Sequence, residues 1–264
     1  MSSHPAARLR APLERVVVLV PTYNEAQSLP ELVAAVREIT PQVDICVIDD
    51  NSPDGTGAIA DALAAADPQI HVIHRAAKQG LGAAYLEGFT WALTAGYDAL
   101  VEMDADGSHR PEDLPALLEA ARDADVVIGS RWVPGGEVVN WPQRRKALSL
   151  GANAYTRVLL GMPVRDATAG FRLYRAHALE VIDLHDVASQ GYCFQVDLTW
   201  RAVRAGLQVV EVPITFVERR HGASKMSGDV VTESMRRVAC WGAGYRAGQA
   251  REVASRLLTR RGES

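Results

Sequence analysis

Cysteine is scarce in this chain of 264 residues. The three cysteines, Cys46, Cys193 and Cys240, are odd in number, lie far apart and form no Cys-x-x-Cys pair. This pattern argues against a secreted disulfide scaffold and against a cysteine-based zinc site, and it favours a reducing compartment. A chain of this length can bury a large core without such cross-links.

Long apolar runs are missing as well. No uncharged stretch is longer than about ten residues, whereas a membrane-spanning helix needs roughly 20 apolar residues. The residues after Met1 form a short polar arm without the apolar core of a secretory signal. With 48% hydrophobic and 23% charged residues, the composition is that of a globular protein. We therefore expect a soluble or surface-bound intracellular protein of one or two domains.

The net charge of −4 conceals an uneven distribution. Residues 219–261 contain ten Arg or Lys and three Asp or Glu, so this segment carries +7 and the rest of the chain −11. Such a basic segment is typical either of a solvated helix or of a surface that meets phosphate groups or an anionic membrane. Charge alone leaves both interpretations open.

Strand and helix patterns alternate through the first half of the chain. Apolar runs rich in β-branched residues predict buried strands at 16–20, 45–48, 70–74, 99–101 and 126–128. Helical periodicity predicts helices between them, at 29–39, 56–66, 81–95 and 111–122. The alternation predicts an α/β fold with a mostly parallel, twisted sheet covered by helices on both faces, as in Rossmann-like proteins. Ligands of such sheets bind at the carboxyl ends of the strands.

The alternation breaks after Gly129. Residues 146–160 have a helical pattern, and 170–174 and 209–217 have strand patterns, the second interrupted by Pro213 and therefore at an edge or kinked. No repeat or linker divides the chain. We expect three segments, namely a flexible N-terminal arm at 1–14, one α/β domain at 15–225, and a basic, amphipathic helical appendage at 226–264.

Polar residues follow the first predicted strand. Pro21 and Tyr23 could pack on a base or ribose, and the Glu25 carboxylate could accept a hydrogen bond from a nucleotide. Taken alone, these residues fit an ordinary strand-to-helix turn better.

An acidic run, residues 49–54, follows the second predicted strand. Clustered carboxylates repel one another unless donors or a cation stabilise them. A turn whose side chains bind their own backbone accounts for Asn51 and Asp54. This leaves Asp50 as the residue that we assign to a ligand.

Asp104 and Asp106, separated by Ala105, follow the fourth predicted strand. Two carboxylates at a strand end can share one hard cation, and Mg²⁺ or Mn²⁺ is commonly held by one or two carboxylates together with diphosphate oxygens. Asp-x-Asp is a frequent sequence, and its position at the carboxyl edge of the sheet is what favours a metal site. We interpret the nearby His109 as structural.

A glycine-rich loop at residues 80–82 follows a strand and opens a helix, as in dinucleotide-binding proteins. However, Tyr85 stands at the third glycine position, and the strand is the third rather than the first. This argues against a hydride-transfer enzyme, although the loop can contact a phosphate through backbone N–H groups. Among the basic residues, Arg131 is predicted to lie at the ligand-bearing edge of the sheet. For Arg145 and Arg219, an ordinary position on the solvated surface is an equally good interpretation.

In this order, the motifs resemble those of family 2 glycosyltransferases, and within that family the polyprenol-phosphate mannose synthases. The resemblance spans about residues 15–240 and is carried by residues 21–25, 48–56, 80–82, 103–106, 129–131, 140–149, 166–171, 191–195, 216–219 and 222–226. The Gln-x-x-Arg-Trp motif of processive polysaccharide synthases is absent from the sequence.

The resemblance implies a GT-A fold and inverting transfer of mannose from GDP-mannose to a polyprenyl phosphate. It implies that the nucleotide sugar is bound by Pro21, Tyr23, Glu25, Ile48, Asp50, Asp104, Ala105, Asp106, Arg131, Arg219 and Lys225. It also implies that Asp104 and Asp106 bind the Mg²⁺ or Mn²⁺ ion and that Arg145, Arg219 and Lys225 bind the acceptor phosphate. Asp106 and Arg131 are implied as the catalytic residues. Family members often carry a Gln after Asp-Ala-Asp as a further metal ligand; here Gly107-Ser108 stands instead, so Ser108 or a water would have to replace it.

The chemistry of the acceptor fits these residue types. A phosphate monoester is largely dianionic at neutral pH because its second pKa is about 6. It therefore needs no general base, unlike a hydroxyl acceptor, but it needs positive charge beside an anionic donor. The sequence supplies arginines and a metal site.

Several alternatives stay open. The sugar could be glucose from UDP-glucose. A metal-dependent nucleotidyltransferase also uses Asp-x-Asp, but the sequence lacks its glycine-rich N-terminal loop with Arg and Lys, and a non-catalytic membrane-surface module would leave the acidic motifs without a role. The arginines at 246–261 predict salt-sensitive, peripheral binding at the cytoplasmic face of a membrane, with or without a membrane-protein partner. For the apolar face before Tyr245, packing on the protein itself is an equally good interpretation. We expect no nucleic-acid partner.

Overall fold

A twisted sheet lies at the centre of the computed structural model, which describes residues 12–185, 187, 191–218, 232 and 234–247. Within these residues the sheet has seven strands. Their spatial order is β3 (Ile70–His74), β2 (Asp44–Asp49), β1 (Val16–Thr22), β4 (Ala99–Glu102), β7 (Arg172–Arg175), β5 (Val126–Ser130) and β8 (Val209–Pro213). β7 is antiparallel to both of its neighbours, and the other pairings are parallel.

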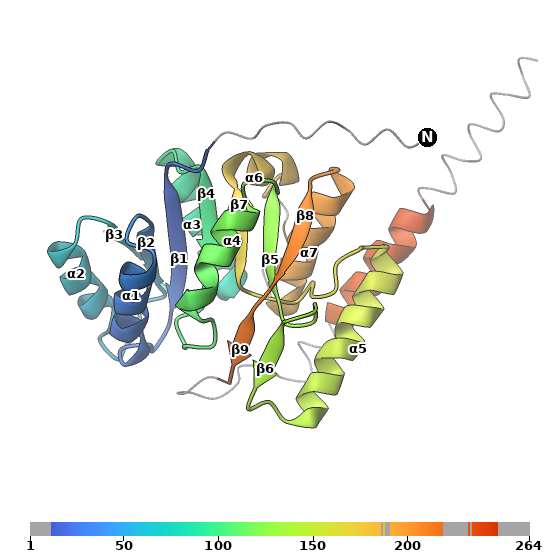
Figure 1. Ribbon diagram of the computed structural model, residues 1–264, viewed down its shortest axis with the longest axis horizontal. Helices are drawn as coiled ribbons and strands as arrows, with labels where there is room; N and C mark the ends of the chain where they lie inside the picture. Colours follow the sequence, from blue (N-terminus) through green and yellow to red (C-terminus); the bar gives the residue numbers. More distant parts are fainter. Residues whose placement is uncertain (1–11, 186, 188–190, 219–231, 233, 248–264) are drawn as a thin grey trace, which may run out of the picture.

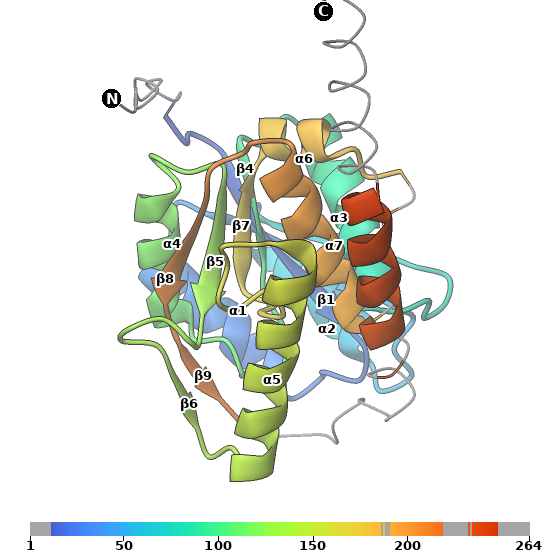
Figure 2. The ribbon, with the colours of Figure 1, turned by 90° about the vertical axis from the view of Figure 1, so that its right-hand side faces the viewer.

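Helices cover both faces of this sheet, as Figures 1 and 2 show. On one side lie α1 (Ser28–Ile39), α2 (Thr56–Ala66), the 3₁₀ turn η1 (Pro111–Asp113) and α4 (Leu114–Ala120). On the other lie α3 (Leu81–Thr94), α6 (Ala176–Ile182) and α7 (Gly191–Arg204). Alternate residues of β1 enter different cores, since Leu19 packs on the α3 side and Val18 on the α1 side. This two-sided burial explains the unbroken apolar runs in the sequence.

The predicted βαβ alternation is confirmed. In the second half of the chain, the direction and pairing of the strands differ from what the local patterns revealed. The predicted strand at 170–174 forms β7, but it is inserted antiparallel between β4 and β5. The predicted strand at 209–217 is broken after Pro213 into β8 and β9 (Thr215–Val217). β9 pairs in parallel with β6 (Glu137–Val139), apart from the main sheet.

Two further helices lie side by side at the end of the molecule beyond β8, as Figures 1 and 2 both show. One is α5 (Gln143–Leu160), and the other, which we call the C-terminal helix, comprises the described residues 234–247. Trp241 stacks on Trp200 of α7 at 5.9 Å between ring centroids, and Arg246 Nη2 donates to the Val158 carbonyl of α5 at 3.0 Å. The part of the predicted appendage that is described therefore packs on the domain itself.

The remaining parts of the expected end segments, residues 1–11, 226–231, 233 and 248–264, lie outside the described residues. Glu14, the last residue of the expected arm, donates its backbone N–H to Asp98 Oδ2 at 3.0 Å. No helix among the described residues combines the length and the apolarity needed to cross a bilayer.

Candidate active site

The loops that follow β1 and β2 are tied to each other. The backbone N–H groups of Asn24 and Ala26 donate to the side chains of Ser52 and Asp54, each at 3.1 Å. Asp54 also accepts a hydrogen bond from Thr56 Oγ1 at 2.6 Å. Asn51 adopts a left-handed backbone with φ of 57°, a conformation that Asn tolerates well. The prediction of a turn side chain that binds its own backbone is confirmed for Asp54, which accepts the Thr56 N–H at 3.1 Å, whereas Asn51 Nδ2 donates instead to the distant Ala76 carbonyl at 3.3 Å.

Asp50 is buried beside these loops and forms an ion pair with Arg75, which directly follows β3. Arg75 also donates through Nε to Glu87 of α3 at 2.8 Å. The Lys78 ammonium lies 3.9 Å from the centroid of the Tyr23 ring. Tyr23, Asp50, Arg75 and Lys78 thus form one charged group of side chains, which we call the Asp50 corner.

Arg75 and Lys78 are absent from the sequence-based site. The signal that could have found them is their position after the third parallel strand, at the same sheet edge as Asp50. Of the remaining predicted residues here, Pro21 is half-buried near the end of β1. The Glu25 carboxylate accepts a hydrogen bond from Ser28 Oγ at 2.7 Å, at the start of α1.

Two predicted contacts have their side chains in the core. Ile48 is fully buried, and an added Cβ at Gly88 of α3 would come within 2.5 Å of its Cδ1 atom. Ala105 is 3% exposed and belongs to the core on the α4 side. Ile48 and Ala105 can therefore meet a ligand only through their backbone.

Asp104 and Asp106 extend from the end of β4, and both are half-buried while Ala105 between them is buried. Asp106 Oδ1 accepts a hydrogen bond from the Ser108 N–H at 3.1 Å, in a turn that Gly107 closes with φ of 74°. Among the described residues, no group of three or more His, Cys, Asp or Glu side chains is arranged to hold a metal. Two hard carboxylates alone fit a cation such as Mg²⁺ or Mn²⁺ that takes its other ligands from phosphate and water.

Asp104 is held from two sides by buried residues. His109 Nδ1 accepts the Asp104 backbone N–H at 3.0 Å, and the Tyr85 hydroxyl donates to Asp104 Oδ1 at 3.4 Å. Burial lowers the pKa of His109, so its imidazole stays neutral and accepts. Burial raises the pKa of Tyr85, so its hydroxyl keeps the proton that it donates. The structural interpretation of His109 is confirmed, and the Tyr85 side chain that breaks the dinucleotide pattern contacts the carboxylate pair.

Glu102, two residues before Asp104, is fully buried at the end of β4. Burial raises its pKa to about 8, although Gln195 Nε2 of α7 donates to its Oε2 atom at 2.8 Å. The Glu102 Oε1 atom has no hydrogen-bond partner among the described residues. Gln195 belongs to a motif that the resemblance singled out, and the structure places it beneath the carboxylate pair.

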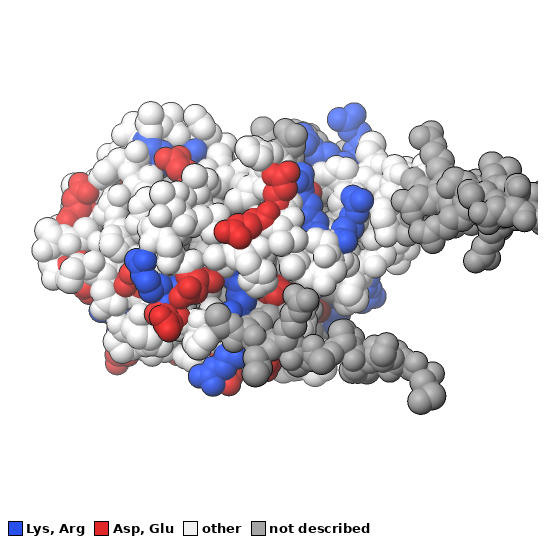
Figure 3. Space-filling model, turned by 90° about the horizontal axis from the view of Figure 1, so that it is seen from above, with Lys and Arg blue, Asp and Glu red and all other residues white. Residues whose placement is uncertain are grey.

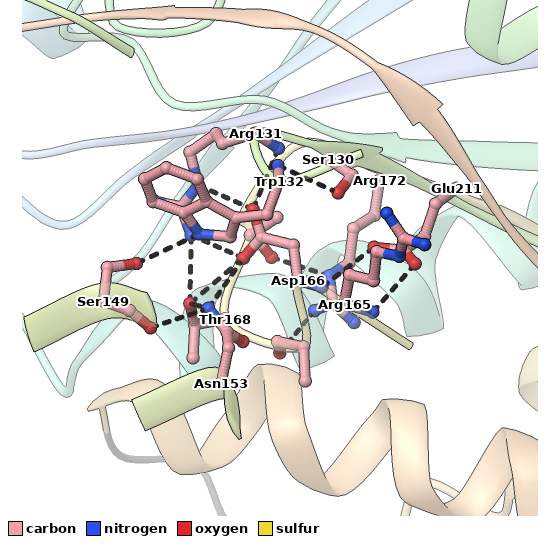
Figure 4. A network of polar contacts seen from close by, with 12 residues as sticks. Ser130, Arg131, Trp132, Ser149, Asn153, Arg165, Asp166, Thr168, Arg172 and Glu211 are labelled. Carbon is pink, nitrogen blue, oxygen red and sulfur yellow. Dashed lines mark hydrogen bonds and ion pairs between the residues drawn. The ribbon is translucent and has the colours of Figure 1, made fainter. Parts of the chain in front are cut away.

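Arg131 follows β5 at the same sheet edge and is buried in a polar network (Figure 4). Its Nε and Nη2 atoms donate to the two carboxylate oxygens of Asp166, each at 2.7 Å. Burial works to raise the pKa of Asp166, but the charge and hydrogen bonds of Arg131 outweigh it and hold that pKa below its usual value. The guanidinium carbon lies 5.4 Å from the ring centroids of both Trp141 and Phe216.

Arg145, in the first turn of α5, lies close to Arg131. Its Nη1 atom donates to Glu218 Oε1 at 2.5 Å, and its guanidinium carbon is 3.9 Å from the Trp141 ring centroid. Both arginines line one end of a groove between α5, α7 and the C-terminal helix. The apolar part of its lining is formed by Leu148, Ala152, Val196, Met235 and Val238. Arg219 and Lys225, the other predicted anion-binding residues, lie outside the described residues.

Gly170 and Phe216 both lie against His109, beside the carboxylate pair. A Cβ added to Gly170 would lie 3.3 Å from His109 Cε1 and 3.7 Å from Asp104 Oδ2. Phe216 of β9 packs edge-on against His109 at 5.5 Å, and the same ring faces Arg131. Phe216 and His109 thus link Arg131, which lines the groove, to the carboxylate pair at the carboxyl edge of the sheet.

The sequence is similar to those of characterised proteins. Residues 17–183 match the profile of glycosyl transferase family 2. Over 244 residues the chain is 59% identical to the polyprenol monophosphomannose synthase of Mycolicibacterium smegmatis, and the match covers 92% of each chain. Over 228 residues it is 57% identical to the undecaprenyl-phosphate mannosyltransferase of Micrococcus luteus, covering 86% of this chain and 94% of the relative.

The fold is similar to that of glucosyl-3-phosphoglycerate synthase from Mycobacterium tuberculosis. The complex of that protein with Mn²⁺, UDP-glucose and phosphoglyceric acid superposes with a TM-score of 0.63, at 18% identity. The match covers 89% of this chain and 80% of the other. At this identity the likeness concerns the fold alone, and it confirms the predicted GT-A arrangement.

Proposed function

The chain belongs to glycosyl transferase family 2, and on this premise we propose that it transfers mannose from GDP-mannose to the phosphate of a polyprenyl phosphate, with inversion at the sugar. The products are polyprenyl-phosphate mannose and GDP. Two mannose-transferring relatives, 59% and 57% identical, support the sugar and the acceptor. The observation that carries the proposal is a groove lined by Arg131 and Arg145 and by apolar side chains, in which Arg131 is linked to Asp104 through the rings of Phe216 and His109.

The donor fits the carboxylate pair and the Asp50 corner. Asp104 and Asp106 would hold Mg²⁺ or Mn²⁺, which supplies charge neutralisation for the diphosphate leaving group. Ser108 is 2% exposed, and its hydroxyl has no hydrogen-bond partner among the described residues, so that hydroxyl or a water would complete the ligands. The Tyr23 ring and the Asp50 carboxylate would contact the guanosine.

The acceptor needs cations rather than a base. As a dianion, the phosphate is already a nucleophile, and it must be held close to a donor of the same sign. Arg131 and Arg145 supply positive charge in the groove, and Arg131 is linked to Asp104 through Phe216 and His109. Arg219 and Lys225 follow the same strand as Phe216 in the sequence, and we assign them to the same phosphates.

The isoprenoid chain of the acceptor fits the groove. The groove follows α5 from Arg145 to Tyr155, which at 1.5 Å per helical residue is about 15 Å. Its remaining lining is mainly apolar, with Ser149, Thr156, Thr168 and Ser234 among the apolar side chains. It would remove the first isoprene units from water while the phosphate stays at the arginines. A water-soluble acceptor would leave this apolar surface without a role.

The side of α5 that faces away from the groove is suited to contact with the membrane in which the acceptor is anchored. Leu150 and Val158 of α5 are 48% and 66% exposed, with the exposed Arg144 and Arg157 on the same helix. Figure 3 shows Lys and Arg side chains toward this end of the molecule. Apolar side chains flanked by cations favour peripheral binding to an anionic bilayer. We place this contact at the cytoplasmic face and on α5, in addition to the predicted contact at 246–261.

The decisive experiment offers the purified chain either GDP-mannose or UDP-glucose, with a polyprenyl phosphate and Mg²⁺ or Mn²⁺. We expect GDP release and a mannosylated lipid that depend on both the metal and the lipid phosphate. Transfer from UDP-glucose alone would make the chain a glucosyltransferase. Release of pyrophosphate instead of GDP would indicate a nucleotidyltransferase, and no turnover of either donor would refute the proposal.

A further inference from the structure

The interaction between Arg131 and Asp166 is unusually complete. Three groups of Arg131 donate to the one carboxylate, namely Nε and Nη2 at 2.7 Å and the backbone N–H at 3.0 Å. Asp166 is fully buried and Arg131 is 6% exposed. A pair held at both its side chain and its backbone fixes the plane of the guanidinium and the direction in which Nη1 leaves it.

Neighbouring residues make this arrangement more rigid. Asn153 Nδ2 of α5 donates to Asp166 Oδ1 at 3.2 Å, and Arg131 Nη2 donates to Thr168 Oγ1 at 2.9 Å. The backbone of the Asp166 loop is itself anchored. Glu211 of β8 accepts the backbone N–H groups of residues 165 and 166, each at 2.8 Å, and Arg172 donates to the carbonyls of residues 167 and 169, each at 2.7 Å. Figure 4 shows these groups converging on the loop.

Stability alone does not explain such a pair. Removing two charges from water costs about as much as their attraction returns, so an apolar pair of similar volume would often hold the fold as well. What the ion pair adds is a fixed orientation for one cation. That cation lines the groove, and the rings of Phe216 and His109 lie between it and Asp104.

We propose that Asp166 is a positioning residue, which holds the Arg131 guanidinium in the orientation that the acceptor phosphate requires for attack on the sugar. This inference rests on the proposed function. Asp166 itself does not touch the substrate, and Asn153 and Thr168 support it from either side. In the absence of this carboxylate, Arg131 still carries its charge but turns among several orientations.

A double-mutant cycle tests whether Asp166 acts through Arg131. Asp166→Asn keeps the size of the side chain and removes its charge, and we expect kcat to fall about 100-fold, as for a misplaced catalytic group. The KM values for the lipid phosphate and for the donor should change by less than roughly threefold, because the cation is still present. In the Arg131→Ala background, Asp166→Asn should cause no further loss. Losses that multiply would overturn the inference.

Glu211→Gln is the matched control, since Glu211 anchors the same loop without a contact to Arg131. We expect it to lower the melting temperature and to leave kcat within roughly threefold of the wild type, so that its effect differs from that of Asp166→Asn. If Glu211→Gln lowers kcat as much as Asp166→Asn does, general loosening of the loop explains both and the inference is wrong.

A spectroscopic measurement keeps the inference separate from the proposed function. In ¹⁵N–¹H spectra of arginine side chains, the buried Nε–H of Arg131 should give a sharp, slowly exchanging signal that Asp166→Asn removes. This result does not depend on which reaction the enzyme performs. Should Asp166→Asn not fold, Thr168→Val removes one support and should speed the exchange of the same proton. An unchanged Arg131 signal in the folded variant would refute the positioning role even if mannose transfer is demonstrated.

Discussion

The Tyr85 hydroxyl offers a sharp test of how the protein prepares its metal site. Tyr85 is fully buried on α3, and its hydroxyl donates to Asp104 Oδ1 at 3.4 Å. Tyr85→Phe deletes only this hydroxyl, and the ring keeps its stacking against Phe194 at 6.0 Å. The substitution therefore isolates one hydrogen bond to one of the two proposed metal ligands.

The size of the effect follows from the geometry. A hydrogen bond to a charged group contributes about 1.5–3 kcal/mol, and the long separation in this pair places it at or below the lower limit. A loss of about 1 kcal/mol corresponds to roughly fivefold, and loss of such a supporting contact typically costs about 10–100-fold in metal affinity. We expect Mn²⁺ to bind Tyr85→Phe about five- to tenfold more weakly in the presence of GDP.

The assay titrates Mn²⁺ into the protein with GDP and follows free Mn²⁺ by electron paramagnetic resonance. Tyr97→Phe is the matched control, because the Tyr97 hydroxyl donates to Asp44 at 2.6 Å and Asp44 is at the start of β2, at the opposite edge of the sheet. It should lower the melting temperature without changing Mn²⁺ binding. Equal Mn²⁺ affinity in the wild type and Tyr85→Phe would show that the hydroxyl does not support the site.

Three further predictions concern the metal, the buried acid and the membrane. Asp104→Asn and Asp106→Asn, like EDTA, should each reduce transfer at least about 100-fold with little change in melting temperature, since both carboxylates are only half-buried; activity in EDTA would refute a metal requirement. Because burial raises the pKa of Glu102 to about 8, the folded protein keeps a proton that the unfolded chain releases, so this group should make the free energy of unfolding fall between about pH 4.5 and 8. Glu102→Gln should flatten that fall in chemical denaturation, and an unchanged slope would show that Glu102 is ionised. The double variant Leu150→Asp, Val158→Asp should abolish salt-sensitive co-sedimentation with anionic liposomes. Truncation after Ala247 should only weaken this binding. If the truncation reduces binding and the double variant does not, the membrane contact is not on α5.

Local sequence was sufficient to predict the first half of the fold and the sheet edge at which the candidate site residues lie. The apolar runs that become β1, β2 and β4 are buried on both faces, so their burial is visible in the pattern itself. A parallel sheet brings the ends of such strands to one edge. For this reason Asp50 and the Asp104–Asp106 pair could be assigned to that edge before any contact was known.

Side-chain direction was less accessible to sequence. Ile48 and Ala105 lie in two of the motifs from which the site was predicted, but their side chains face the core. Conversely, Arg75 contacts Asp50 and Tyr85 contacts Asp104, although no motif identified Arg75 or Tyr85 as a ligand residue. A motif identifies a stretch of chain, whereas the pleat of a strand or the turn of a helix decides which of its residues face the ligand.

Only the tertiary structure decided which distant segments meet. β7 has the sequence of an ordinary buried strand, and nothing local shows that it runs antiparallel between β4 and β5. The Arg131–Asp166 pair joins residues 35 positions apart, through a loop that β7 and β8 anchor. Local propensity and periodicity determine elements, because they depend on neighbours along the chain. Pairing between elements depends on how their surfaces pack and on where buried charges find partners, and these are properties of the whole fold.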